Sequence, residues 1–272
     1  MKPWKLPRLL FFVSVVAISL PLENYLSAQH RYDLLIRSGH VIDPRNEIDG
    51  EMDVAVLDGK IAQVSQEIPP EEARRVVDAT GLIVAPGLID IHVHAFYGTE
   101  PHSDYSDGFL ALPPDGFTLR SGVTTAVDTG GSGWRNFRRF KENVIDRSQT
   151  RILAMLNIVG AGMKGDPTEQ DLNDMDPKLT AMMARQFPEL IVGVKVAHYR
   201  GPEWDPVQRA VEAGGLADLP VMVDFGRHIP PLSLQELLLE RLRPGDIFTH
   251  AYAEIDEREP IVGPDGRVRS FA

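Results

Sequence analysis

The chain of 272 residues contains no cysteine. This absence excludes disulfide bonds, iron–sulfur clusters, cysteine-bound zinc and cysteine nucleophiles. Any metal would have to bind histidine, carboxylate or another oxygen donor. Positive charge is also scarce, because 28 Lys and Arg stand against 39 Asp and Glu, which gives a formal net charge of −11. Nucleic acids and anionic membrane surfaces need a basic face, so neither is expected as the main partner.

Long hydrophobic runs are missing as well. The most apolar stretch, Leu9 to Leu20, is shorter than the ~20 residues that span a bilayer. Basic residues precede this stretch, and the small pair Ser27-Ala28 follows it. This order is typical of a secretory signal, so residues 1–28 are interpreted as a signal peptide of a periplasmic or secreted protein without stable membrane insertion. An uncleaved N-terminal anchor is the alternative.

The rest of the chain divides into two parts by its hydrophobic pattern. Residues 29–80 contain short alternating runs, and the two runs around Asp58-Gly59 predict a β-hairpin. We interpret this part as the N-terminal portion of a small β-sandwich lobe. Residues 81–272 contain apolar strands separated by stretches that can form helices, which is typical of a parallel sheet built from βα units.

Six strands and four helices are expected in this second part. The strands are expected at residues 82–94, 123–128, 152–159, 190–198, 221–225 and 246–252, and the helices at 136–146, 177–186, 206–213 and 234–242. Polar and histidine residues gather at the carboxyl ends of the strands, the face that carries the active site of a TIM barrel. The predicted fold class is therefore α/β, an incomplete (β/α) TIM barrel of about six strands with a small N-terminal β-sandwich lobe.

The most informative motif is Pro86-Gly87-Leu88-Ile89-Asp90-Ile91-His92-Val93-His94. Side chains alternate along a strand, so His92 and His94 should point to the same face. Two neighbouring imidazoles on an apolar strand are costly to bury without a partner, and a transition-metal ion is a suitable one. The alternative is a pair of hydrogen-bonded structural histidines. We predict that His92 and His94 bind a divalent metal.

At this motif the sequence resembles the amidohydrolase superfamily, which begins its barrel with a similar strand after a small β-sandwich lobe. The deacetylase and dihydroorotase-like branch is the more similar one, at Asp33–Asp43 and at Gly122–Gly130. The likeness extends over residues 32–252. It implies a metal-dependent hydrolase that holds two divalent ions, expected to be zinc, and cleaves an amide or cyclic amide in a small molecule, such as an N-acyl amino acid.

Three later strands carry the other residues that the resemblance places at the metals. Lys195 is a lone lysine in an apolar strand, where burial would lower the pKa of its amine and allow it to form a carbamate with carbon dioxide. The resemblance implies that carboxylated Lys195 bridges the two metals; a lysine that reaches solvent at the strand rim is the alternative. His250 is implied as a ligand. Asp224 replaces the usual histidine of the family, and its carboxylate can still bind zinc.

Asp90, Asp128 and Asn157 also lie at or near strand ends. We expect them to brace the metal site or to contact substrate, although Asp and Asn at such places are often turn formers.

The resemblance also implies a general acid/base Asp at the end of an eighth strand. We expect that residue beyond the C-terminus, so no catalytic residue is assigned, the barrel is interpreted as truncated, and little turnover is expected. The alternative function is accordingly a truncated, catalytically inactive barrel that retains partial metal binding. A carbohydrate-active barrel ranks last, because no carboxylate pair stands out. An oligomer is compatible with the sequence.

Overall fold

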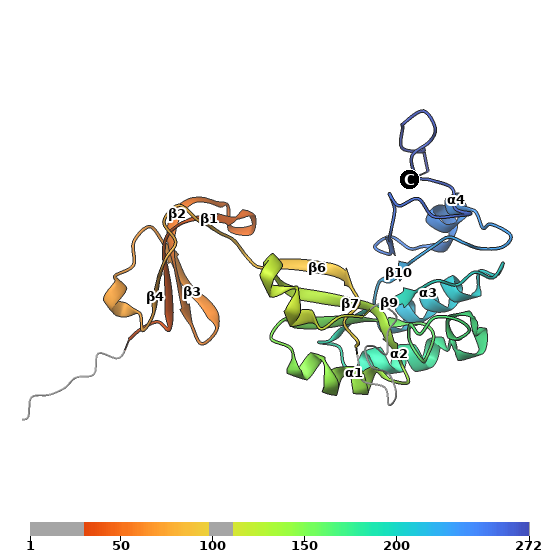
Figure 1. Cartoon of the computed structure of the whole chain (residues 1–272), viewed down its shortest axis with the longest axis horizontal. Helices are drawn as coiled ribbons and strands as arrows, with labels where there is room; N and C mark the ends of the chain where they lie inside the picture. The colour runs from red at the N-terminus through yellow and green to blue at the C-terminus, as the bar shows by residue number, and fades with distance from the viewer. Residues whose placement is uncertain (1–29, 98–110, 272) are drawn as a thin grey trace, which may run out of the picture. The chain divides into compact units, whose positions relative to one another are not determined.

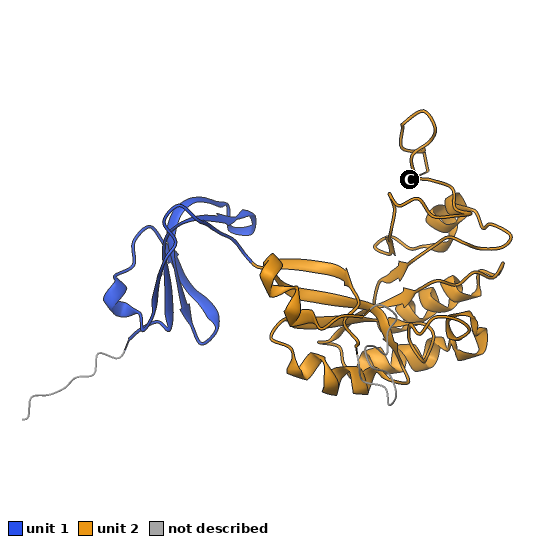
Figure 2. Ribbon diagram, in the orientation of Figure 1, with its two compact units in different colours: residues 1–86 blue, residues 87–272 orange. Residues whose placement is uncertain are grey.

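The structure is a computed structural model that describes residues 30–97 and 111–271. The interpretation of residues 1–28 as a signal peptide lies outside the described residues. The chain forms two compact units, Met1–Pro86 and Gly87–Ala272 (Figure 2). In the described ranges, no helix is both long and apolar enough to cross a membrane.

The described part of the first unit is one mixed sheet in the order β3-β2-β1-β4, with β5 also paired to β1. Strands β1 to β3 are antiparallel neighbours, whereas β4 and β5 run parallel to β1. The elements are β1 (Leu34–Asp43), β2 (Ile48–Leu57), β3 (Lys60–Ser65), β4 (Val76–Asp78), β5 (Ile83–Val84) and the 3-10 helices η1 (Pro44–Asn46) and η2 (Pro70–Glu72). The first unit extends to Pro86 because β5 pairs with β1.

The predicted hairpin in this unit is confirmed, since Leu57 of β2 pairs with Lys60 of β3. Asp58 and Gly59 have φ angles of 51° and 71°. Two consecutive positive φ angles are the geometry that matches the twist of a two-residue hairpin, and Asp-Gly adopts it at low cost.

The second unit is built on a parallel sheet in the order β11-β10-β9-β8-β7-β6, so neighbouring strands are also consecutive along the chain. Helices α1, α2 and α3 lie on one side of this sheet (Figure 1). The strands are β6 (Leu88–Val93), β7 (Val123–Gly133), β8 (Arg151–Asn157), β9 (Ile191–Val196), β10 (Val221–Val223) and β11 (Ile247–Phe248). The helices are α1 (Phe137–Asn143), α2 (Pro177–Gln186), α3 (Asp205–Ala217) and α4 (Leu234–Glu236), with the π-helical turn η8 (Leu237–Arg241) and the 3-10 helices η3 (Pro114–Gly116), η4 (Leu119–Ser121), η5 (Ile145–Arg147), η6 (Thr168–Gln170) and η7 (Leu172–Asp174).

Local sequence explains where several of these elements begin and end. Helix α2 begins after Asp176, whose carboxylate accepts hydrogen bonds from two backbone N–H groups of the first turn, and Pro177 occupies a position that needs no donor. Strand β9 is buried along most of its length, as expected of a strand covered on both faces. Strand β11 is shorter than expected because His250 adopts a φ of 55°, which a strand does not accommodate.

Asp246 fixes the loop that leads into β11. Its carboxylate accepts hydrogen bonds of 2.8 Å from each of the backbone N–H groups of Val221 and Arg243, and it also pairs with the Arg243 guanidinium at 2.8 Å. Burial acts to raise the pKa of Asp246, but the hydrogen bonds from Arg243 and Val221 hold this pKa below its usual value.

We predict that Asp246→Asn lowers the free energy of unfolding by about 1–3 kcal/mol, because a buried donor loses a charged acceptor. The pKa of Asp246 is lowered on folding, so its contribution is present above the ordinary pKa of ~4 and is lost as the pH falls through the folded value. Urea denaturation should therefore show a difference from wild type at pH 7 that narrows in acid. Glu212→Gln, on the exposed face of α3, is the control. If Asp246→Asn and Glu212→Gln changed the free energy of unfolding equally, the stabilising role assigned to Asp246 would be contradicted.

Candidate active site

The two histidines of β6 meet a third histidine that follows β11. The ring centroids of His92 and His94 lie 5.5 Å apart, and those of His92 and His250 lie 4.9 Å apart. Nδ1 of His92 and Oγ1 of Thr249 share a hydrogen bond of 2.8 Å. Strands β6 and β11 are the two edges of the sheet. The sheet must therefore curl until its first and last strands touch at their carboxyl ends.

Lys195 lies on β9, with only 1% of the residue exposed. Its Nζ has no hydrogen-bond partner among the described residues. Burial lowers the pKa of Lys195 to about 8, although the carboxylates of Asp224 and Asp128 act in the opposite direction. The amine is therefore not solvated at the strand rim, and its unprotonated form is more accessible than that of an ordinary lysine.

The imidazoles of His92 and His94 are neutral at physiological pH. Burial, helped by the charge of Lys195, lowers the pKa of His92 to about 3 and that of His94 to about 4. Nδ1 of His94 is buried without a hydrogen-bond partner among the described residues. Neutral imidazole is the form that binds metals, so both side chains are in the state that a metal site requires.

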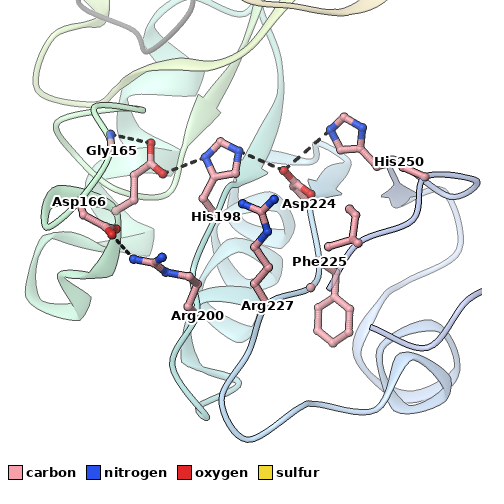
Figure 3. A pocket seen from close by; sticks show the side chains of 12 residues that line it. Gly165, Asp166, His198, Arg200, Asp224, Phe225, Arg227 and His250 are labelled. Atoms are coloured by element: carbon pink, nitrogen blue, oxygen red, sulfur yellow. Dashed lines mark hydrogen bonds and ion pairs between the residues drawn. The ribbon is translucent and has the colours of Figure 1, made fainter. Parts of the chain in front are cut away.

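Asp224 follows β10 and takes part in a chain of polar contacts that sequence analysis did not identify. Its Oδ2 lies 3.3 Å from Nε2 of His198 and 3.8 Å from Nε2 of His250. Nδ1 of His198 in turn lies 2.9 Å from Oε2 of Glu169, which is buried. In Figure 3, dashed lines mark the contacts of both ring nitrogens of His198, one of which is with Asp224.

The charges of this chain stabilise one another. Hydrogen bonds to Asp224 and Glu169 raise the pKa of His198 to about 9, so the ring is protonated at neutral pH. Burial acts to raise the pKa of Asp224, but the hydrogen bond from His198 and the charge of Lys195 bring it to about 2. His198 could have been found from its position two residues beyond β9, at the carboxyl end of the sheet. Glu169 gave no comparable sequence signal.

The three other predicted residues, Asp90, Asp128 and Asn157, form side-chain hydrogen bonds with the backbone near the site. Oδ1 of Asp90 accepts a 3.0 Å hydrogen bond from the backbone N–H of His92. Fully buried Asp128 accepts backbone hydrogen bonds from Ala95 at 2.6 Å, Phe96 at 3.3 Å and Gly131 at 2.8 Å. Burial raises the pKa of Asp128 to about 6 in spite of these donors. Asp128 thus fixes the chain just after His94.

Asn157 shapes the neighbouring loops in the same manner. Its Oδ1 accepts from the backbone N–H of Val159 at 3.0 Å, and its Nδ2 donates to the carbonyl of Gly130 at 3.2 Å. Gly130 has a φ of 90°, and a Cβ at this position would lie 2.8 Å from Cγ of Lys195. A side chain at Gly130 would therefore displace Lys195.

An open cavity of about 570 Å³ lies beside the histidines and contains His198, Asp224 and His250 in its wall (Figure 3). The other lining residues are Gly165, Asp166, Glu169, Arg200, Phe225, Gly226, Arg227, Ala253 and Ile255. Arg258 joins two of the loops that form this wall. Its guanidinium donates to the carbonyls of Phe225 at 3.3 Å and His250 at 2.9 Å.

The individual donors suit a divalent metal, but their present arrangement is not a complete ligand shell. In residues 30–97 and 111–271, no group of three or more His, Asp or Glu side chains is arranged so that it could hold a metal ion. Neutral imidazoles and a buried amine without a partner nevertheless form a donor set that fits zinc or a similar ion, once the amine is converted to a carbamate.

The sequence and the fold are similar to those of known proteins, although no family model matches the chain. It is 32% identical to a deacetylase of Agrobacterium fabrum over 202 residues, which are 72% of this chain and 47% of that protein. A deacetylase of Brucella anthropi is also 32% identical, over 75% of this chain and 50% of its own length. The chain thus spans about half the length of these two relatives.

Solved structures agree with these relatives. A crystal structure of an adenine deaminase matches with a TM-score of 0.73 and 25% identity, over 88% of this chain and 62% of that one. A dihydroorotase structure matches with a TM-score of 0.67 and 27% identity, over 84% and 59%. The chain belongs to the amidohydrolase superfamily. The predicted α/β fold class, a TIM-barrel type of which six consecutive parallel strands are seen, is confirmed.

The buried amine of Lys195 gives a prediction about stability. Lys195→Met keeps the length of the side chain and removes a polar group that has no partner among the described residues. We expect the free energy of unfolding of the metal-free protein to rise by about 1–3 kcal/mol, because burial of an unpaired polar or charged group is unfavourable. Urea denaturation in the presence of a chelator measures the change.

Lys60→Met, at an exposed position of β3, is the matched control and should change the free energy of unfolding by less than about 0.5 kcal/mol. If Lys195→Met lowered stability instead, the amine would be making a favourable contact that the described structure does not contain.

Proposed function

We propose that this chain is a metal-dependent amidohydrolase that cleaves a C–N bond, in an amide or cyclic amide of a small molecule such as an N-acyl amino acid. The observation that carries the proposal is the buried amine of Lys195, which has no hydrogen-bond partner among the described residues, beside the neutral imidazoles of His92 and His94. Similarity to proteins named deacetylase and dihydroorotase supports the same reaction class.

In this proposal two zinc ions are held by five residues of the second unit. His92 and His94 would hold one ion, Asp224 and His250 would hold the other, and Lys195, once carboxylated, would supply a further ligand. Bound in this way, the two metals supply Lewis-acid activation of water and of the amide carbonyl.

The chain's own residues keep these donors in place. Thr249 and Asp90 fix the ring and the backbone of His92 through the hydrogen bonds described above. His198 holds the Asp224 carboxylate and is itself held by Glu169. Such outer partners orient a ligand and set its basicity, and their loss commonly lowers metal affinity 10- to 100-fold.

The N-terminal sequence supports a further proposal about location. We propose that residues 1–28 direct the protein to the periplasm or the outside of the cell. N-terminal sequencing of the exported protein would test this, and a mature chain that retains residues 1–28 would contradict it.

The first functional prediction concerns metal content. The full chain, purified in the presence of zinc and bicarbonate, should contain zinc well above background by elemental analysis. The double variant His92→Ala/His94→Ala should lose most of this metal, because it removes both imidazoles of β6.

His40→Ala removes a half-exposed imidazole of the first unit and is the control. Zinc content at background in the wild type, or unchanged in the double variant, would contradict the assignment of these two ligands.

The second functional prediction concerns turnover. Zinc-loaded protein should release acetate from N-acetyl amino acids only slowly, because no general acid/base residue is assigned in the chain. A chelator should abolish the release, and zinc should restore it. Removing a metal ligand by His250→Ala should lower kcat/KM at least 100-fold, since metal activation of water and carbonyl depends on the complete site. Hydrolysis that survives chelation would refute metal dependence. Zinc binding without hydrolysis would favour the alternative of an inactive barrel.

A further inference from the structure

The charged side chains of the cavity are largely matched to one another. Asp166 forms an ion pair with Arg200. Glu169 and Asp224 both contact His198, one on each ring nitrogen. These contacts give each of the three carboxylates in the cavity wall a cationic partner (Figure 3).

Arg227 is the exception. It lines the cavity, yet its guanidinium forms no hydrogen bond or ion pair with any of the described residues. Its side chain extends from the loop after β10 toward the side of the cavity where His198 and Asp224 lie (Figure 3). A planar guanidinium with free N–H groups is suited to bidentate binding of a carboxylate.

The backbone holds Arg227 in this position. Its φ of 61° lies in the left-handed region, which is unfavourable for a residue with a side chain, and its N–H donates to the carbonyl of Asp256 at 3.1 Å. Gly226 precedes it with a φ of 144°, where a Cβ would lie 2.6 Å from Cγ2 of Ile255. Strained conformations of this kind persist where the surroundings enforce them and are concentrated at functional sites.

We propose that Arg227 binds a carboxylate of the substrate, so that the cavity selects amides that carry a carboxylate over neutral amides of the same shape. The inference rests on the proposed function for the nature of the scissile bond, and adds the charge of the substrate and the residue that recognises it. The Arg200 guanidinium is already engaged by Asp166, which leaves Arg227 as the available cation among the described residues of the cavity wall.

The test compares two ligands that differ in one charge. N-acetylalanine and N-acetylalaninamide are titrated into the full chain, treated with a chelator so that neither is consumed, and binding is followed by ligand-observed NMR. We expect wild type to bind the acid about tenfold more tightly than the amide. Arg227→Gln should reduce this preference to less than about threefold with amide binding unchanged, and Arg227→Lys should retain part of it.

Lys and Gln meet the same backbone cost as Arg at a positive φ, so these variants leave the strain of the loop unaltered. Arg120→Gln is the matched control, because it removes one exposed arginine of the same unit outside the cavity wall. Thermal unfolding checks that all variants are folded as well as wild type.

Four results would overturn the proposal: no binding of the acid by wild type, equal binding of acid and amide, a preference that persists in Arg227→Gln, or an equal loss in Arg120→Gln. The same ligands given to the zinc-loaded chain separate this proposal from the proposed function. A preference that depends on Arg227 without hydrolysis of either ligand would refute the function and leave the carboxylate site intact. Hydrolysis of both ligands at equal kcat/KM would support the proposed function and refute the carboxylate site at Arg227.

Discussion

The contact between the two edge strands of the sheet is the constraint on which the site depends. His92 on β6 and Thr249 after β11 share a hydrogen bond although four strands separate β6 from β11 in the sheet order. A flat parallel sheet would keep these residues far apart, since neighbouring strands are ~4.8 Å from one another. The curl brings His92, His94 and His250 together and points the ends of β9 and β10 at the same space. Without it, the five predicted ligands would lie along an edge instead of around a centre.

Burial then gives chemically different groups the ionisation states that the proposed metal site needs. It keeps His92 and His94 neutral and lowers the pKa of Lys195, so that three nitrogen atoms are available as donors or for reaction with carbon dioxide. Burial also opposes ionisation of Asp224, but there the cationic His198 prevails and the carboxylate remains charged. The difference lies in the partners: Asp224 has a cation within 3.3 Å, whereas Lys195 has no hydrogen-bonded partner in the described part of the chain.

Period-two alternation was enough to predict that His92 and His94 share one face of a strand, because this signal is local. Lys195 and His250 were assigned to the site only through the resemblance to the superfamily. Local patterns also identified the hairpin at Asp58-Gly59 and helix α2 with its observed bounds. They did not reveal the contacts of Glu169, which follows no strand and meets His198 only through the fold of the segment between β8 and α2. Strand pairing in the first unit was equally inaccessible, since β4 and β5 both pair with β1 across long stretches of sequence.

Backbone strain is concentrated at the same end of the sheet. Three residues of the cavity wall, His198, Arg227 and His250, have φ angles of 53°, 61° and 55°. Left-handed backbone costs roughly 1–2 kcal/mol for a residue with a side chain, so three such residues near one cavity need compensation. Arg258 provides part of it, because its buried guanidinium binds the carbonyls of Phe225 and His250 and so joins the loops after β10 and β11. The rigid packing of β7 to β10 beneath these loops lets the chain keep conformations that isolated loops would relax, and this turns a regular sheet into a site with fixed side-chain directions.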